Sequence, residues 1–226
     1  MELTHRDYEI LKLVGSFTQL ASSHLGELVF ADRSHSVPDR VLARLVRLKY
    51  LNRVGRRASG DKGGAGAYAY QLGRYGRVLL DIEGRQSLSV NNHALLIADT
   101  YLELRRAEKA GVLVVKEWEV ELPVPPAVRA DLFVSLDFPG QRRSSRYFLE
   151  IDLGTEAPVR LREKIAGYWQ AAESSDDEYF PYVAFVVKHE VRRREIERII
   201  GKLPEEQQDM VRVFMFGEVV SRLIGL

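Results

Sequence analysis

The chain has 226 residues, which suits one large domain or two small ones. Its 46% hydrophobic and 29% charged residues are an ordinary globular balance that excludes wholesale disorder. No apolar run reaches the roughly 20 residues that cross a bilayer, and the charged start MELTHRDYEI lacks the apolar core of a signal peptide. The lack of cysteine excludes disulfides, Cys-zinc sites and thiol catalysis. We therefore expect a cytoplasmic protein with no membrane partner.

The net charge of +1 conceals an uneven distribution. Residues 1–90 carry 14 Lys/Arg and 9 Asp/Glu, a net of +5, whereas the rest carry 19 and 23, a net of −4. Within 40–77, 10 basic residues stand against one acid, Asp61, a net of +9. Such a concentration is typical of a surface that binds a polyanion, although a charge run alone more often forms a solvated face. The pattern of apolar residues beneath the charges decides between these interpretations.

The first 30 residues predict two helices. Thr4, with Asp7 three residues later, is typical of a helix-capping box, and Leu11 and Val14 follow at helical spacing. Thr18 is expected to cap a second helix that carries several leucines. The polar segment ADRSHS then separates this helix from a third.

The third helix is predicted over 37–50. Pro38 is suited to its first turn, and an apolar face follows. The helix also carries a basic face. Residues 40, 44 and 47 are arginines at spacings of four and three, so they share one side of the helix. We expect this helix to present a basic surface.

Residues 52–72 change to the period of a strand. Tyr68 and Tyr70 alternate with small or polar residues, and the Gly-rich stretch 60–66 predicts a hairpin tip. Three helices followed by a basic hairpin are the order of a winged helix, which a short helix at about 74–83 would close. The hypothesis is that helix 37–50 enters a groove of double-stranded DNA and the hairpin forms the wing. The cations expected to contact DNA are Arg40, Arg44, Arg47, Arg53, Arg56, Arg57 and Lys62.

We expect a winged-helix domain over 1–84, a linker over 85–91 and a second domain over 92–226. The second domain is predicted to begin with a long helix to about residue 110, and three strands, a helix and a buried strand follow. The fold class is therefore α+β: an N-terminal winged helix-turn-helix, then an α/β domain with a mixed central sheet. The predicted strands are 112–122, 129–137, 145–154, 181–188 and 211–216, and the larger predicted helices are 158–174 and 190–201.

Carboxylates mark the second candidate site. Glu150 and Asp152 lie two apart in one strand and so point to one face, and Asp131 lies in the preceding strand. Converging carboxylates are what Mg²⁺ or Mn²⁺ requires, and a bound metal can activate water against a phosphate. The alternative interpretation is the polar outer face of a sheet edge. Glu156 and Lys164 are near in sequence.

The order of helix, hairpin with Asp131, strand with FLEID, helix and strand resembles the PD-(D/E)XK nuclease fold. The phrases RADLFVSL, YFLEIDLGTE and LREKIAGYWQA, after a winged helix, are similar to the replication-relaxation family of plasmids, phages and other mobile elements. This resemblance implies a DNA-binding protein that acts in plasmid replication, relaxation or mobilisation. It also implies catalytic roles for Asp131, Glu150, Asp152 and Lys164, with the three carboxylates as metal ligands.

Two departures from the nuclease pattern favour a degenerate domain that does not cleave DNA. Asp152 stands where the pattern has lysine, and Ala130 stands where it has proline. Lys164 from the following helix can replace the missing lysine, so an active Mg-dependent DNA endonuclease or nickase is the alternative. A dimeric transcriptional repressor is the second alternative.

Three further expectations concern assembly and the remaining charged residues. We expect a homodimer formed through the helices 91–110 and 190–201. The run Arg192–Arg194 is expected to face solvent in i,i+4 pairs with glutamates. The five histidines lack metal-ligand or triad spacing and are interpreted as single surface or core residues.

Overall fold

A computed structural model describes residues 2–34, 36–57, 66–83 and 86–225 of the chain. The chain divides into two compact units, the N-terminal unit Met1–Leu102 and the C-terminal unit Glu103–Leu226. The division falls inside the long helix α5 (Asn92–Lys109). In the described part of the chain, no helix combines the length and apolar character that a membrane span needs.

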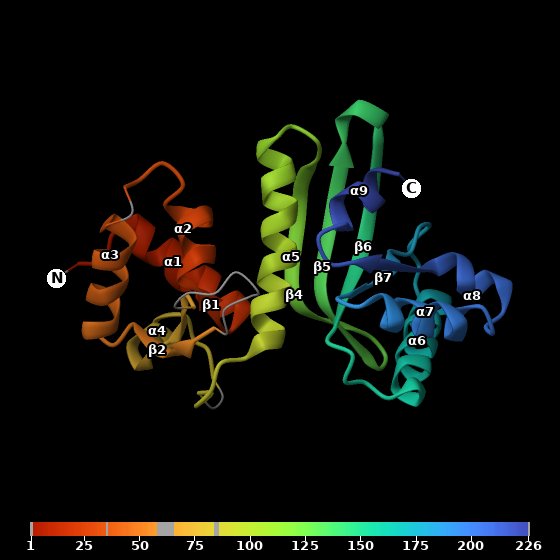
Figure 1. Cartoon of the computed structure of the whole chain (residues 1–226), viewed down its shortest axis with the longest axis horizontal. Coiled ribbons are helices and arrows are strands. Elements are labelled where there is room, and N and C mark those ends of the chain that lie inside the picture. Colours follow the sequence, from red (N-terminus) through yellow and green to blue (C-terminus); the bar gives the residue numbers. More distant parts are fainter. Residues whose placement is uncertain (1, 35, 58–65, 84–85, 226) are drawn as a thin grey trace. The chain divides into compact units, whose positions relative to one another are not determined.

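The N-terminal unit contains helices packed on a small antiparallel sheet with the strand order β1-β3-β2 (Figure 1). Its core is apolar, with Ile10, Leu25 and Leu45 fully buried on three different helices. The elements before α5 are α1 (His5–Phe17), β1 (Leu20–Ala21), α2 (Ser22–Val29), α3 (Ser36–Arg47), β2 (Leu51–Arg56), β3 (Tyr68–Leu72) and α4 (Arg74–Leu79).

The start of α1 agrees with the sequence, whereas the start of α2 does not. Thr4 caps α1, and the Asp7 side chain accepts the Thr4 N–H at 2.8 Å, which completes the predicted box. The prediction that Thr18 caps the second helix is wrong. Thr18 ends α1, with φ 60°, because residues 20 and 21 form β1 against β3 before α2 begins. His24 supports the new start, since its Nδ1 accepts the Ala21 N–H at 3.2 Å.

A β-bulge interrupts the pairing of β2 with β3. Arg53 pairs with Tyr70 and Gly55 pairs with Ala69, so Val54 is an extra residue on β2. In a regularly paired strand of this length, side chains three positions apart, such as those at 53 and 56, would lie on opposite faces of the hairpin. The bulge instead places both on the face that carries Tyr68. The predicted tip at 60–66 lies mostly outside the described residues.

The C-terminal unit is built on a five-stranded mixed sheet with the order β4-β5-β6-β7-β8. Strands β4, β5 and β6 are antiparallel neighbours, and β6, β7 and β8 are parallel. The expected α+β class with a mixed sheet is confirmed. The elements after α5 are β4 (Val114–Val124), β5 (Val128–Phe138), β6 (Arg143–Asp152), α6 (Pro158–Glu173), β7 (Tyr182–Val187), α7 (Glu190–Ile200), α8 (Glu205–Met210), β8 (Val211–Met215) and α9 (Val219–Ile224), with a 3-10 turn at Pro139–Gln141.

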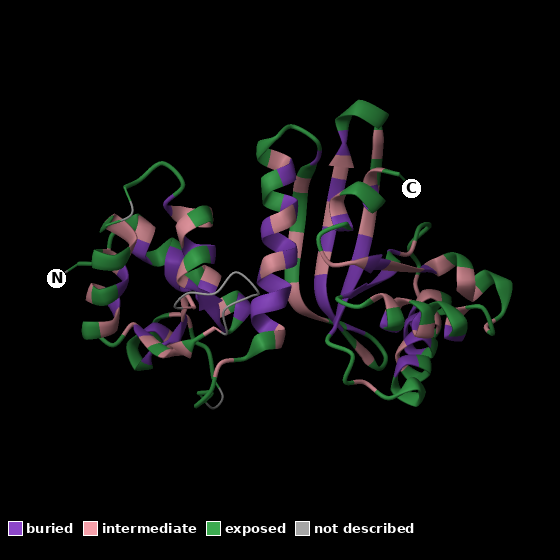
Figure 2. Ribbon diagram, viewed as in Figure 1, coloured by how far each residue is buried: buried purple, intermediate pink, exposed green. Residues whose placement is uncertain are grey.

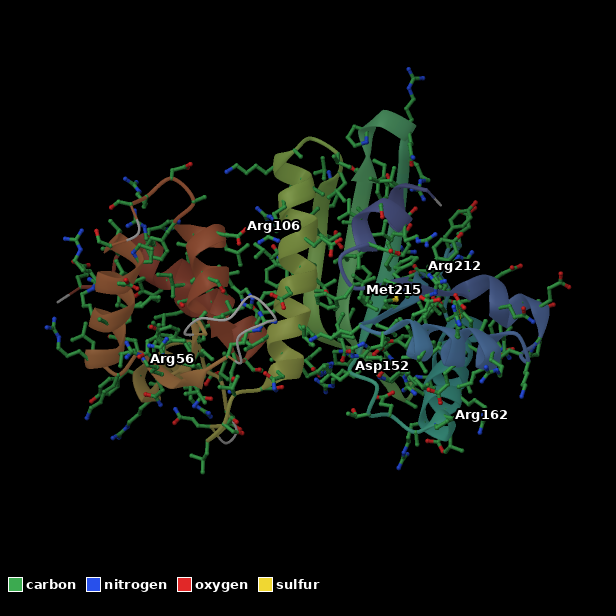
Figure 3. The ribbon with its side chains drawn as sticks, viewed as in Figure 1. Arg56, Arg106, Asp152, Arg162, Arg212 and Met215 are labelled. Carbon is green, nitrogen blue, oxygen red and sulfur yellow. The ribbon has the colours of Figure 1, made fainter. Side chains whose placement is uncertain are left out.

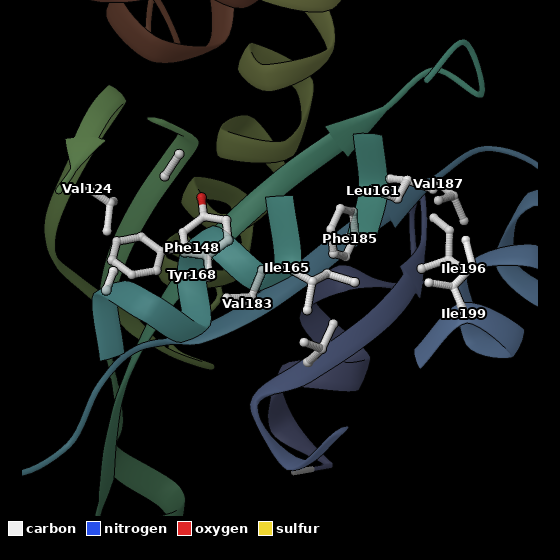
Figure 4. Packing of buried hydrophobic residues seen from close by; sticks show 13 residues of the cluster. Val124, Phe148, Leu161, Ile165, Tyr168, Val183, Phe185, Val187, Ile196 and Ile199 are labelled. Atoms are coloured by element: carbon white, nitrogen blue, oxygen red, sulfur yellow. The ribbon is translucent and has the colours of Figure 1, made fainter. Parts of the chain in front are cut away.

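Helices α6 and α7 cover one face of this sheet. Each belongs to a crossover between parallel strands, and such crossovers share one hand and so one face. Their apolar residues, among them Ile165 and Ile196, pack with Phe148 and Phe185 in a single cluster (Figure 4). Strand β6 is buried from residue 147 to residue 152, and β7 is buried from residue 183 to residue 187 (Figure 2). The carboxylates of β5 and β6 therefore lie in a layer with little access to water.

Candidate nucleic-acid interface and buried carboxylate site

The three arginines predicted to share the basic face of α3 have different environments. Arg40 and Arg47 are exposed. Arg44 is directed to α1, where its guanidinium pairs with Asp7, whose side chain is only 1% exposed. An arginine that neutralises a buried carboxylate fixes the packing of α3 on α1. The surface that α3 offers to a polyanion therefore consists of Arg40 and Arg47.

On the hairpin, two exposed arginines converge on one tyrosine. The Cζ atoms of Arg53 and Arg56 lie 4.0 and 3.9 Å from the centroid of the Tyr68 ring. Arg56 also donates to the Tyr68 hydroxyl at 2.8 Å and to the Gly66 carbonyl at 2.9 Å. Stacking on an aromatic face orders a guanidinium without neutralising its charge. The bulge at Val54 thus produces an ordered pair of cations on one face of the hairpin.

Arg57, also predicted to contact DNA, is part of an internal network. It donates from both terminal nitrogens to Asp99 on α5, with Nη1 2.9 Å from Oδ1. The buried His24 lies on the same carboxylate, with Nε2 2.9 Å from Oδ1. Although burial acts in the opposite direction, Arg57 and His24 together lower the pKa of Asp99 to about 2. Arg57 therefore ties the base of the hairpin to α2 and α5.

Four further cations of this unit bear on the prediction of DNA contacts. Lys62, predicted to contact DNA, lies outside the described residues. Arg33, Lys49 and Arg74 are also exposed, although the sequence pattern does not predict that they contact DNA. No local pattern marks them, because each stands singly in a turn or at a helix end.

In the C-terminal unit, Asp131 of β5 and Glu150 of β6 are brought together. The pairing of Leu132 with Leu149 makes them neighbours across the two strands. Asp131 Oδ2 accepts the Ile151 N–H at 2.7 Å, and a hydrogen bond links the Asp131 and Glu150 side chains. A hydrogen bond between two carboxyl groups requires that one of them holds a proton. Asp131 is 7% exposed and Glu150 is 1% exposed, so this pair lies in the interior.

Helix α6 supplies two partners to Glu150. Lys164 Nζ lies 2.9 Å from Glu150 Oε2 and 3.2 Å from Glu156 Oε1, so the structure brings Lys164 to the carboxylates as the sequence suggested. The Tyr168 hydroxyl donates to the other oxygen of Glu150. Both oxygens of Glu150 are therefore engaged by groups on one helix.

The titration of these groups follows from burial and proximity. Burial raises the pKa of Asp131 and of Glu150, and for Glu150 the nearby Asp131 charge raises it further. Burial acts to lower the pKa of Lys164, but the carboxylates of Glu150, Asp131 and Glu156 outweigh it and raise that pKa. Burial and the Glu150 charge raise the pKa of the Tyr168 hydroxyl. Near neutral pH the cluster is a charged lysine beside carboxyls that share a proton.

Asp152, the third predicted carboxylate, turns to a different partner. Arg192 of α7 donates from Nε to Asp152 Oδ2 at 2.7 Å, and its Nη2 donates to the Glu156 carbonyl at 2.8 Å. The expectation that Arg192 faces solvent is wrong, because this residue is only 7% exposed. The spacing of the apolar residues could have predicted this burial. Residues 192, 196 and 199 share the inner face of α7, and residues 196 and 199 are buried isoleucines.

These donors do not fit a divalent metal ion in the arrangement observed. Among the residues that the structure describes, no group of three or more His, Cys, Asp or Glu side chains is placed to hold one. A hard cation needs several free oxygen ligands in near-octahedral geometry. Here Lys164 and Tyr168 engage Glu150, and Arg192 engages Asp152.

One strained residue adjoins the carboxylate pair. Glu121 of β4 lies between the pairs Val120–Leu132 and Leu122–Ala130, opposite Asp131, and has a φ of 56°. This left-handed conformation is unfavourable for a residue with a side chain, and such strain concentrates at functional sites. Its charge also acts to raise the pKa of Asp131.

The fold and the two sites describe a two-unit α+β protein with an exposed basic surface and a buried charged cluster. A family model described as replication-relaxation matches residues 11–183, which is more than half of the chain, so the protein belongs to the replication-relaxation family. A comparison with curated proteins finds no match.

Proposed function

We propose that the protein binds double-stranded DNA through the N-terminal unit, which acts as a winged helix. The observation that carries the proposal is the set of exposed guanidiniums on α3 and the hairpin: Arg40, Arg47, Arg53 and Arg56. Helix α3 has the place in the chain of a recognition helix, and the hairpin β2–β3 has the place of a wing. Arginine on a short helix suits base edges, whereas arginine on a wing suits phosphates.

Membership of the replication-relaxation family connects this binding to the replication or relaxation of plasmid or other mobile-element DNA. In this proposal the N-terminal unit locates the site on the duplex. A dimeric repressor would use the same unit, and selection of bound sequences separates the two roles, because a homodimer would recover a palindrome.

Fluorescence anisotropy with a labelled duplex at increasing salt tests the binding. Each phosphate contact that is lost should reduce the slope of log affinity against log salt by about 1. The double variant Arg40→Gln/Arg47→Gln is therefore expected to bind more weakly with a shallower slope. The matched control is Arg162→Gln, which removes one exposed charge from α6. Affinity that is indifferent to salt, or unaltered in the double variant, would overturn the proposal.

We also propose that the C-terminal unit is a degenerate PD-(D/E)XK domain that supports assembly or DNA contact rather than cleavage. Three contacts support this proposal. Lys164 neutralises Glu150, Tyr168 occupies the second Glu150 oxygen, and Arg192 occupies Asp152. A nuclease of this fold would need those oxygens for a metal ion and its water.

Supercoiled plasmid incubated with Mn²⁺ tests the alternative of an active endonuclease or nickase. Intact supercoiled DNA is the expected result. Nicking that disappears in Asp131→Ala would show instead that the carboxylates rearrange into an active site. Nicking that persists in this variant would be assigned to a contaminating nuclease, and repurified protein would then give the deciding result.

A further inference from the structure

An open cavity of about 1010 Å³ lies in the C-terminal unit at the beginning of β6. Its lining combines cations with aromatic rings: Arg143, Arg146, Arg212, Trp169, Tyr179 and Tyr182. Strand β6 runs from Arg143 to Asp152, so this cavity and the carboxylate cluster lie toward opposite ends of the same strand. Figure 3 shows Arg212 and Asp152 at separate places in the unit. The cavity therefore has a chemistry of its own.

The aromatic rings of the cavity present surface to solvent. Tyr179 is 72% exposed and Tyr182 is 41% exposed, which is unusual for side chains of this size. Tyr182 is backed by the buried ring of Tyr147, with centroids 5.8 Å apart and an interplanar angle of 29°. Tyr182 is therefore an ordered ring with an exposed edge, whereas Tyr179 presents most of its ring to solvent and can stack on a further planar group.

The arginines are held in place by the protein itself. Arg212 lies over the Tyr182 ring, with Cζ 5.3 Å from the centroid, and donates to the Asp209 carbonyl at 2.7 Å. Arg146 is anchored to Asp177 at 3.0 Å and to the Tyr179 carbonyl. A guanidinium has five N–H donors, so these contacts leave donors for a ligand while fixing the side chain.

The charge balance indicates the class of ligand. Glu178 and Asp209 also line the cavity, and Asp177 pairs with Arg146, so acids largely balance the charge of the three arginines. Such a balance does not suit a compact polyphosphate. It suits a chain whose planar groups supply much of the contact and whose phosphates are few and spaced.

We propose that this cavity binds single-stranded DNA, with bases stacked on the exposed tyrosines and Trp169 and with phosphates at the arginines. The site is distinct from the surface proposed for duplex DNA in the N-terminal unit. A protein with both surfaces could hold a duplex and an unpaired strand, which occur together where an origin has been opened.

Trp169 gives the experiment its reporter, because Trp118 is the only other tryptophan of the chain. In the variant Trp118→Phe, an oligo(dT) of about 12 nucleotides, within the usual range of single-strand site sizes, is expected to quench the Trp169 emission saturably. Tyr179→Ala should weaken this binding about tenfold, as loss of one base stack does. Arg212→Gln should weaken it and reduce its salt dependence.

Three controls separate the proposal from its rivals. Tyr75→Ala, which removes an exposed tyrosine from the N-terminal unit, should leave the quenching unchanged. Arg40→Gln/Arg47→Gln should also leave it unchanged, so failure of duplex binding and failure of this site are distinguishable. Emission that oligo(dT) does not alter, in protein that still unfolds cooperatively in urea, overturns the proposal. Equal affinity for dTMP and oligo(dT) overturns the assignment of a strand as the ligand.

Discussion

In the N-terminal unit, Arg40, Arg47, Arg53 and Arg56 extend from α3 and the hairpin into solvent, whereas in the C-terminal unit Lys164 and Arg192 are drawn into contact with buried carboxylates. Both groups consist of basic side chains, but the two environments give their charges different roles. An exposed cation keeps its charge available to a polyanion, whereas a cation paired in the interior contributes to the fold through its partner.

The comparison also holds inside the N-terminal unit. Arg44 and Arg57 are both predicted to lie on the DNA-binding surface, but Arg44 pairs with Asp7 of α1 and Arg57 pairs with Asp99 of α5. The basic stretch therefore contains exposed arginines and arginines paired with carboxylates. Its net charge overstates the number of cations that a ligand can reach. Substitutions can separate these two groups, because stability should change in one and binding in the other.

The largest expected effect is at Arg192. Arg192→Met should lower the free energy of unfolding by about 3–5 kcal/mol, because it leaves Asp152 buried without its cation. Arg194→Met on the same helix is the matched control, since that side chain is 71% exposed and its ion pair is worth at most about 1 kcal/mol. Urea unfolding measures both variants. Equal losses would mean that the Asp152–Arg192 contact does not hold α7 in place.

The next effect compares two arginines of α3. Arg44→Gln should cost about 1–3 kcal/mol in the free energy of unfolding, because Asp7 is then buried without its charged partner. Arg47→Gln makes the same chemical change at an exposed position and should leave stability unaltered while weakening duplex binding. Unfolding and anisotropy measurements on both proteins check this division. A stable Arg44→Gln protein that has lost DNA binding would place Arg44 on the interface instead.

A third effect depends on pH. Burial raises the folded-state pKa of Glu150, so its contribution to stability is present at acid pH and is lost as pH rises through that raised pKa. Glu150→Gln resembles the protonated side chain at every pH. The variant should therefore gain stability relative to wild type as the pH rises from about 5 to about 8, as measured by urea unfolding at both pH values. A difference that is the same at both pH values would show an ordinary Glu150 pKa.

The smallest effect on stability is expected at Tyr68. Tyr68→Leu removes the ring under Arg53 and Arg56 and should cost about 1 kcal/mol or less, as exposed cation–π contacts do. Duplex affinity should fall more than this, because both arginines then lose conformational entropy when they bind. Tyr68→Phe keeps the ring and is the control. Affinity equal to wild type in Tyr68→Leu would mean that the ring does not organise the wing.

Local sequence patterns predicted the helices and strands better than they predicted which side chains contact one another. The two-residue spacing of Glu150 and Asp152 correctly put both on one face, and the strand order brought Asp131 to Glu150. The contact of Asp152 with Arg192 spans 40 positions along the chain, and nothing adjacent to either residue marks it. The start of α2 was misplaced for a similar reason, since β1 exists only because β3 pairs with it.

The extra residue at Val54 has a consequence for how the hairpin can vary. A change of register that removed the bulge without changing the length of the strand would send one of the two guanidiniums to the other side, because side chains three positions apart alternate in a regular strand. Every side chain in that segment could be retained and the shared cationic face would still be lost. Deletion of Val54 should instead preserve that face, because Arg53 and Arg56 would then lie two positions apart in a regularly paired strand.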